Sequence, residues 1–326
     1  MNSSNSVEHF VTLFDSNYLP MGMALHESLT AHGLPFHLWI LCMDELVEKQ
    51  LEKISLPHVT LMPLGGVETR ELLEVKPGRG RGEYCWTMTP FTFQAVFDRD
   101  AGVERVTYLD SDLFFFASPR VLLRELDEAG KHVLITEHAY APEYNEWMAL
   151  SGRFCVQFLT FRRTAEAKKV MDWWQRKCLE WCFARQEEGK FGDQKYLDVW
   201  PELFADEVHI VQQTEKTLAP WNVDHVERTS GAPLAPVFFH FHGLKLVGPR
   251  RARLCDNYRI GSEGLRLYGV YAKALGRGLD TLQASGMPVP YRRERFSPMR
   301  MIRSVLNRTP RFMKIPLELP ARRGGS

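Results

Sequence analysis

Short apolar runs rich in β-branched and aromatic residues alternate along this chain with longer segments whose apolar residues recur at helical spacing. The runs Phe10–Phe14, Phe36–Cys42 and Val59–Leu64 are predicted strands, and the intervening segments Met21–Ala31 and Glu45–Ile54 are predicted helices. Alternation of this kind is typical of a largely parallel sheet covered by helices. We therefore predict an α/β fold with a mixed, mainly parallel sheet flanked by helices.

The same pattern continues through most of the chain. A glycine-rich loop is predicted at Lys76–Gly82, a helix at Pro90–Asp98, and a long helix capped by Thr164 that ends at Gly189. Further strands are predicted at Arg105–Leu109, Val133–Thr136, Cys155–Phe161 and Val237–Phe241. We expect one α/β domain over residues 7–285, followed by a basic appendage over residues 286–326.

The composition is that of an ordinary globular protein, with 44% hydrophobic and 25% charged residues, which excludes collagen-like and wholly disordered chains. The N-terminus lacks a basic start followed by an apolar stretch, and no run approaches the roughly 18 apolar residues of a membrane span. We expect a cytoplasmic protein. The six cysteines show no CxxC spacing, so reduced core thiols are favoured over disulfides or a zinc site.

Charge is unevenly distributed, because residues 286–326 contain ten Lys and Arg residues against two Glu residues. On a helix, Met301, Val305 and Leu306 would face away from Arg300, Arg303 and Arg308, which suits an anionic membrane surface. We expect this tail to attach the protein peripherally to the inner face of the cytoplasmic membrane. A solvated, disordered end is the alternative. The acidic body offers no broad basic face for nucleic acid.

Two aspartates, Asp110 and Asp112, follow the predicted strand Arg105–Leu109 and are separated by Ser111. In open α/β sheets, ligands gather at the carboxyl ends of strands. The apolar residues after Asp112 place both carboxylates between buried segments, where they would need a cation or hydrogen-bond donors. Hard oxygen ligands suit Mg²⁺ or Mn²⁺. A metal site is favoured over a pair of solvated turn residues.

An imidazole for this site is available near the end of the strand Val237–Phe241. His240 and His242 alternate with aromatic residues and therefore project to one face. Gly243 permits close backbone approach, and Lys245 adds a cation. One imidazole among carboxylates favours Mn²⁺. Structural histidines remain an equally weighted interpretation from the residues alone.

Two further segments carry candidate binding residues. Asp193 and Gln194 begin a short predicted helix, where Asp193 is either an N-cap or a group that bonds sugar hydroxyls. Asp15, Asn17 and Tyr18 occupy the first strand-to-helix turn, without the GxGxxG or GxxxxGK[ST] patterns of dinucleotide and P-loop sites.

Taken in order, these motifs resemble those of the GT-A nucleotide-sugar transferases. The likeness is strongest to the family 8 type, which includes glycogenin and bacterial lipooligosaccharide galactosyltransferases, and to glycosyltransferases of bacterial polysaccharide clusters. The resemblance covers about residues 9–246 and implies a metal-dependent hexosyltransferase that moves a sugar from a UDP-hexose to a saccharide or glycolipid, with retention of configuration. It also implies a bacterial enzyme of lipopolysaccharide or capsule biosynthesis.

The resemblance assigns roles residue by residue. Leu13, Asp15, Asn17 and Tyr18 hold the uridine, and Ser111 belongs with the donor-binding residues. Asp110, Asp112 and His240 ligate Mn²⁺ or Mg²⁺, while Gly243 and Lys245 lie at the diphosphate. Asp193 and Gln194 contact the donor sugar as the catalytic pair, and the loop Tyr140–Trp147 aligns the acceptor.

Three positions depart from that family. Lys245 lies one residue early, the segment FTFQAVF before Asp110 lacks the usual Arg or Lys, and Cys155 and Gln157 occupy a strand that normally reads Phe-Asn-x-Gly. Two alternatives stay open: a noncatalytic nucleotide-sugar or glycan-binding protein, and a phosphatase of the haloacid-dehalogenase type. The latter motif continues with a small residue and Thr or Val, whereas Leu113 and Phe114 follow here.

Overall fold

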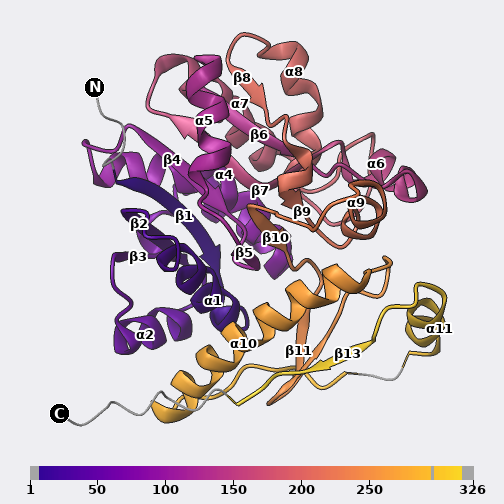
Figure 1. Ribbon diagram of the computed structural model, residues 1–326. Coiled ribbons are helices and arrows are strands. Elements are labelled where there is room, and N and C mark those ends of the chain that lie inside the picture. The colour runs from indigo at the N-terminus through magenta and orange to yellow at the C-terminus, as the bar shows by residue number, and fades with distance from the viewer. Residues whose placement is uncertain (1–6, 295–296, 318–326) are drawn as a thin grey trace.

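A computed structural model describes residues 7–294 and 297–317 and has a central seven-stranded sheet of order β3-β2-β1-β4-β7-β6-β8 (Figure 1). Of these strands, β7 alone runs antiparallel to its two neighbours. The strands are β1 Glu8–Phe14, β2 Phe36–Cys42, β3 Val59–Pro63, β4 Arg105–Leu109, β6 Val133–Glu137, β7 Phe154–Arg162 and β8 Val208–Ile210. The predicted mixed, mainly parallel sheet is confirmed.

Two three-stranded sheets complete the strands of the described residues. One has the order β5-β10-β9 and the other β11-β12-β13. Their strands are β5 Leu113–Phe115, β9 Thr217–Leu218, β10 Phe238–His240, β11 Lys245–Gly248, β12 Arg251–Arg253 and β13 Phe312–Lys314. The first of these sheets matters for function, because it continues from the carboxyl end of β4.

Helices cover both faces of the central sheet (Figure 1). They are α1 Leu19–Thr30, α2 Glu45–Ile54, α3 Arg70–Val75, α4 Arg81–Arg99, α5 Arg120–Ala129, α6 Glu146–Ser151, α7 Ala165–Glu180, α8 Trp200–Leu203, α9 Val223–Thr229, α10 Ser262–Ala284 and α11 Pro298–Leu306. On one face, α4 and α7 bury Phe93 and Trp174 in a shared core. On the other face, α1 packs against the long helix α10.

None of the helices in the described part of the chain combines the length and the hydrophobicity needed to cross a bilayer.

Two helix predictions were wrong at their ends. Helix α4 begins at Arg81, inside the predicted loop, because the Glu83 carboxylate accepts a 2.6 Å hydrogen bond from the Gly80 N–H and caps the first turn. Pro90 therefore lies inside the helix. Helix α7 starts after its predicted cap, Thr164, but ends at Glu180, because Trp181 is extended.

The basic segment after residue 285 is partly built into the body. Strand β13 pairs with β12, and Ile315 is fully buried in the core beside α10. The division of the chain into an α/β domain and a separate C-terminal appendage stays a prediction. Arg295, Glu318, Arg322 and Arg323, which contribute to the predicted tail charge, lie outside the described residues.

Gly22 sets how closely α1 approaches β1. A Cβ atom at Gly22 would lie 2.4 Å from a ring carbon of Phe14, which is buried. We expect Gly22→Ala to lower the free energy of unfolding by about 1–3 kcal/mol, since the overlap outweighs the better helix propensity of alanine. Urea unfolding measures this change.

Gly269→Ala is the matched control, because it lies in α10 with nothing within 4 Å of an added Cβ. That variant is expected to gain up to about 1 kcal/mol. Equal stability of both alanine variants would contradict the close packing of α1 on β1.

Candidate active site

Backbone hydrogen bonds hold the turn Asp110–Asp112 to strand β7 and to the residue that follows strand β10. The Asp110 N–H donates to the Gln157 carbonyl of β7 at 3.0 Å, and the Phe241 N–H donates to the Asp112 carbonyl at 3.0 Å. Strand β10 pairs antiparallel with β5, which sets His240 opposite Leu113. The pairing of β10 with β5 therefore places His240 beside the two aspartates, although it lies in a distant part of the chain.

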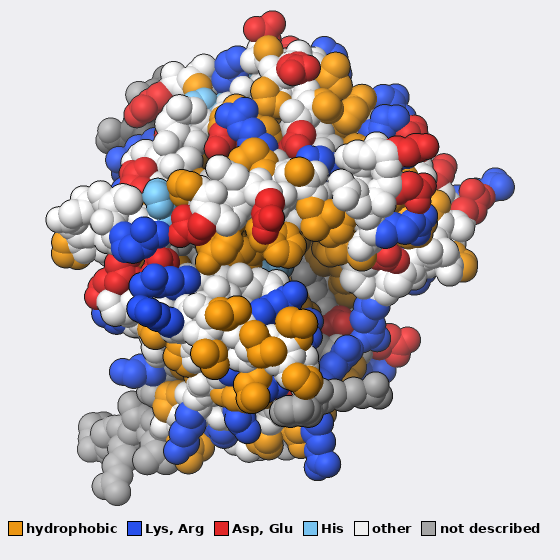
Figure 2. All heavy atoms as spheres, turned by 90° about the vertical axis from the view of Figure 1, so that its right-hand side faces the viewer, with side chains coloured by type: hydrophobic (Ala, Val, Ile, Leu, Met, Phe, Trp, Pro, Cys, Tyr) orange, Lys and Arg blue, Asp and Glu red, His pale blue; other side chains and the backbone are white. Residues whose placement is uncertain are grey.

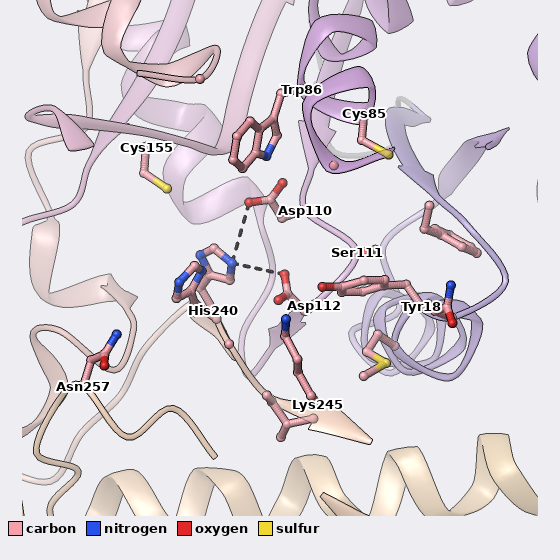
Figure 3. A pocket seen from close by; sticks show the side chains of 18 of the residues that line it. Tyr18, Cys85, Trp86, Asp110, Ser111, Asp112, Cys155, His240, Lys245 and Asn257 are labelled. Atoms are coloured by element: carbon pink, nitrogen blue, oxygen red, sulfur yellow. Dashed lines mark ion pairs between the residues drawn. The ribbon is translucent and has the colours of Figure 1, made fainter. Parts of the chain in front are cut away.

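The three predicted metal ligands meet at this turn. His240 Nε2 lies 3.1 Å from Asp112 Oδ1 and 3.6 Å from Asp110 Oδ2 (Figure 3). The Tyr108 hydroxyl donates to Asp110 Oδ1 at 3.0 Å and orients that carboxylate. Asp110, Asp112 and His240 thus come together as the sequence predicted.

The pKa values of Asp110, Asp112 and His240 depend on one another. Burial raises the pKa of Asp110 to about 6, with the negative Asp112 adding to the shift. Burial acts in the same direction on Asp112, but the charge and hydrogen bond of His240 outweigh it and lower the Asp112 pKa. Burial opposes the charged form of His240, yet Asp112 raises the His240 pKa well above its ordinary value. In the absence of a metal, an imidazolium proton balances the carboxylates.

The environment of His240 fits a divalent ion. Gln157 Oε1 lies 2.7 Å from His240 Nδ1, so Nδ1 donates and Nε2 faces the carboxylates. Two carboxylates and one imidazole are a ligand set for Mn²⁺, and the proton on Nε2 occupies the place of a metal bond. Asp110, Asp112 and His240 would hold the ion.

A cavity of about 970 Å³ opens at this turn, a size suited to a nucleotide-sized ligand. Every residue predicted for metal, nucleotide or sugar lines this cavity. They are Leu13, Asp15, Asn17, Tyr18, Asp110, Ser111, Asp112, Asp193, Gln194, His240, Gly243 and Lys245. The structure brings them together, while their individual roles remain predictions.

Arg81 is a cavity residue that the sequence analysis missed. Its guanidinium donates to Asp15 Oδ2 at 2.9 Å, and Asp15 also accepts from the Asn17 N–H at 2.9 Å. Arg81 lies in the first turn of α4, within the stretch predicted to be a loop. It supplies a cation near the turn after β1, whereas the segment FTFQAVF, where the family usually has a basic residue, contains no Arg or Lys.

Tyr18 and Lys245 both lie beside Asp112, to its right and below it in Figure 3. Burial and the charge of Asp112 raise the pKa of Tyr18, whose hydroxyl stays protonated. Gly243 adopts a positive φ of 74°, and a Cβ there would lie 3.2 Å from Cys255 Sγ. Glycine therefore allows the sharp turn that leads from His240 to Lys245.

Asp193 is not a side-chain cap of the short helix Gln194–Val199. Its carbonyl accepts from the buried Trp174 indole at 2.9 Å, which fixes the turn. Burial and the charge of Asp110 raise the pKa of Asp193 to about 8. Gln194 Nε2 donates to the Ser151 carbonyl at 2.9 Å, which fixes the orientation of its amide.

A cluster of aromatic side chains around Trp221, called the aromatic wall below, lies near β10 and was not predicted from the sequence. The Trp221 indole N–H donates to the His138 carbonyl at 2.5 Å, and the Trp221 ring packs edge-on against His240 at 5.5 Å. Tyr140 and Trp147 of the predicted acceptor loop pack against this wall, together with Tyr258. No local pattern around Trp221 signals this contact.

Two proteins of Bacillus subtilis (strain 168), the uncharacterized proteins YfnD and YfnF, are similar to this chain. YfnD is 32% identical over 292 residues, which cover 86% of this chain and 92% of YfnD. YfnF is 31% identical over 251 residues, which cover 73% of this chain and 82% of YfnF. No protein-family model matches the chain.

Among solved structures, the apo form of the glycosyltransferase GlyE from Streptococcus pneumoniae TIGR4 superposes with a TM-score of 0.50 at 13% identity. The alignment covers 86% of this chain but 64% of the GlyE chain. The likeness extends to the mainly parallel sheet and its helices, and the fold is the predicted GT-A fold. On the identity with the two Bacillus proteins, the chain belongs to the family of YfnD and YfnF.

Proposed function

We propose that this protein is a metal-dependent glycosyltransferase that moves a hexose from a UDP-sugar to a saccharide or glycolipid acceptor, with retention of configuration. The observation that carries the proposal is the convergence of Asp110, Asp112 and His240 at the wall of the 970 Å³ cavity. The GT-A fold supports the same reaction class.

The residues that line the cavity would contribute to the reaction through their charges and through the shapes of their side chains. A divalent cation held by Asp110, Asp112 and His240 would offset the negative charge that develops on the leaving diphosphate. Tyr18 offers a ring for the base, and Lys245 and Arg81 add positive charge along the cavity. Asp193 and Gln194 line the same cavity, where the Gln194 side-chain carbonyl, and Asp193 once it is ionised above its pKa of about 8, would favour an oxocarbenium-like carbon.

The aromatic wall suits the acceptor. Trp221, Tyr258 and Trp147 present flat apolar rings, against which a sugar can pack while its hydroxyl points toward the donor. We assign the activity to bacterial surface polysaccharide synthesis in the cytoplasm. A phosphatase is not favoured by the GT-A fold. A noncatalytic nucleotide-sugar-binding protein would show donor binding without turnover.

Removal of one carboxylate tests the metal site. We expect Asp112→Ala to reduce UDP-hexose hydrolysis or transfer about 100-fold or more, as loss of about 3 kcal/mol of transition-state stabilisation predicts. Wild-type activity should require Mn²⁺ or Mg²⁺ and stop in EDTA. Asp172→Ala, an exposed change on α7, is the control and should keep full activity. Undiminished wild-type turnover in EDTA would contradict the proposal.

Because the carboxyl group of Asp193 is buried, we expect its replacement to raise folding stability and to remove activity. Its folded pKa of about 8 lies above its ordinary value of 3.8, so the folded state binds the proton more tightly. Folding stability should therefore fall as pH rises between these values, and Asp193→Asn should remove that fall. The variant is expected to gain a few kcal/mol near pH 8 and almost nothing near about pH 4.

Thermal unfolding in EDTA across this pH range measures the effect, and the transfer assay should show the variant to be inactive. A gain that is the same at every pH would contradict the assigned burial of the ionised carboxylate.

The attachment to an anionic membrane rests on α11. Met299, Met301, Ile302, Val305 and Leu306 are 49–75% exposed on this helix. Arg303 donates to Asn257 Oδ1 at 3.1 Å and ties the helix to the body, and both Arg300 and Asn257 line the cavity. On the face shown in Figure 2, hydrophobic side chains gather beside Lys and Arg side chains in the lower half, where Figure 1 places α11. A glycolipid acceptor would meet the cavity there.

Vesicle sedimentation tests this attachment. We expect the double variant Val305→Glu and Leu306→Glu to bind phosphatidylglycerol-containing vesicles at least about 10-fold more weakly than the wild type, because two apolar contacts become charged. The control pair, Leu73→Glu and Leu203→Glu, changes side chains of 52% and 54% exposure elsewhere. Equal loss in both pairs, or no loss in the first, would contradict a membrane role for α11.

A further inference from the structure

A thiol lies at the metal site beside the expected ligands. The donor atoms of Asp110, Cys155 and His240 all lie within 4.8 Å of one another. Figure 3 shows the Cys155 side chain pointing toward Asp110 and His240. Cys155 is 4% exposed and lines the cavity, so its sulfur is withdrawn from bulk solvent but faces the site.

Strand β7 explains why the thiol is placed there. Cys155 and Gln157 are two residues apart on this strand and therefore project to the same face. Gln157 bonds His240 Nδ1, and the Gln157 carbonyl holds the Asp110 N–H. The strand thus fixes the orientation of the imidazole and positions the sulfur beside it.

The spacing fits a thiophilic ion. Zinc bonds to sulfur are about 2.3 Å and to nitrogen or oxygen about 2.0–2.2 Å, so the donor atoms of two ligands on a tetrahedral ion lie about 3.5 Å apart. The three donor atoms, which all lie within 4.8 Å of one another, would approach one another by about 1.3 Å at most to surround the ion. A site of carboxylate, imidazole and thiolate prefers Zn²⁺ or Co²⁺ to Mg²⁺.

The other thiols lack this setting. Cys178 on α7 and Cys182 just after its end are buried in the core, and Cys85 lines the cavity but does not belong to the three-donor group. Burial raises the pKa of the Cys155 thiol, while the neighbouring His240 acts in the opposite direction. A bound cation would favour the thiolate.

We propose that Cys155 is a metal ligand, which together with Asp110 and His240 forms a site for a thiophilic divalent ion such as Zn²⁺. On binding, the thiol proton leaves to solvent and the sulfur donates an electron pair to the ion. Because Asp110 and His240 are shared, this ion would compete with the Mn²⁺ of the proposed function. The inference rests on the proposed function only for the location of the site.

Cobalt provides the direct test, because a thiolate ligand gives Co²⁺ a near-ultraviolet charge-transfer band. Titration of the full chain with Co²⁺, without donor sugar, should produce this band at one equivalent, and Zn²⁺ should remove it. Cys155→Ser should lose the band and bind Zn²⁺ at least about 10-fold more weakly. Cys85→Ser, a thiol change in the same cavity, should keep both properties.

Two further measurements keep the outcome unambiguous. Zinc-edge X-ray absorption of the wild type should show one Zn–S distance of about 2.3 Å, which requires no variant. Asp112→Ala should lose sugar transfer but keep the cobalt band. A wild-type protein without the band or the Zn–S distance, or a Cys155→Ser protein that retains the band, would overturn the inference while leaving Mn²⁺-dependent transfer intact.

Discussion

The candidate site depends on the two backbone hydrogen bonds that hold the turn Asp110–Asp112 between β7 and β10. The Gln157 carbonyl fixes the start of the turn, and the Phe241 N–H fixes its end. Side chains more than a hundred residues apart are thereby brought to one place by strand pairing, which leaves little freedom in their positions. Any ion bound there meets ligands that the sheet has already arranged, so little conformational entropy is lost on binding.

This arrangement carries an electrostatic cost. Asp110, Asp112 and Asp193 are close enough for their charges to interact, and burial disfavours the ionised form of each. The His240 proton offsets part of the cost. A divalent cation would offset more of it, because it attracts both carboxylates of the turn and removes the need for the imidazolium. The burial of these carboxyl groups therefore costs stability that a cation at the proposed metal site would restore.

The sequence predicts the parts of this molecule that local patterns determine. Apolar runs mark the strands, and an aspartate pair after one strand together with a histidine at the end of another marks the three residues that meet at the proposed metal site. The contributions of Gln157 and Arg81 were not predictable, because they depend on contacts between distant segments. Gln157 is significant only when β7 lies beside β10, and Arg81 reaches the cavity only because Glu83 starts α4 early. Cys155 was interpreted as a core thiol, since its neighbours in the sequence are apolar.

The same pairing explains how the site can vary without loss of the fold. Cys155 and Gln157 face the site from β7, while Val156 and Phe158 between and after them face the two cores. Substitutions at the site-facing positions would change the donor atoms around the proposed ion while leaving the side chains of these two cores in place. Substitutions at the core-facing positions would instead shift β7 and separate Asp110 from His240. The positions of this one strand are therefore divided between the proposed ion site and the two cores of the fold.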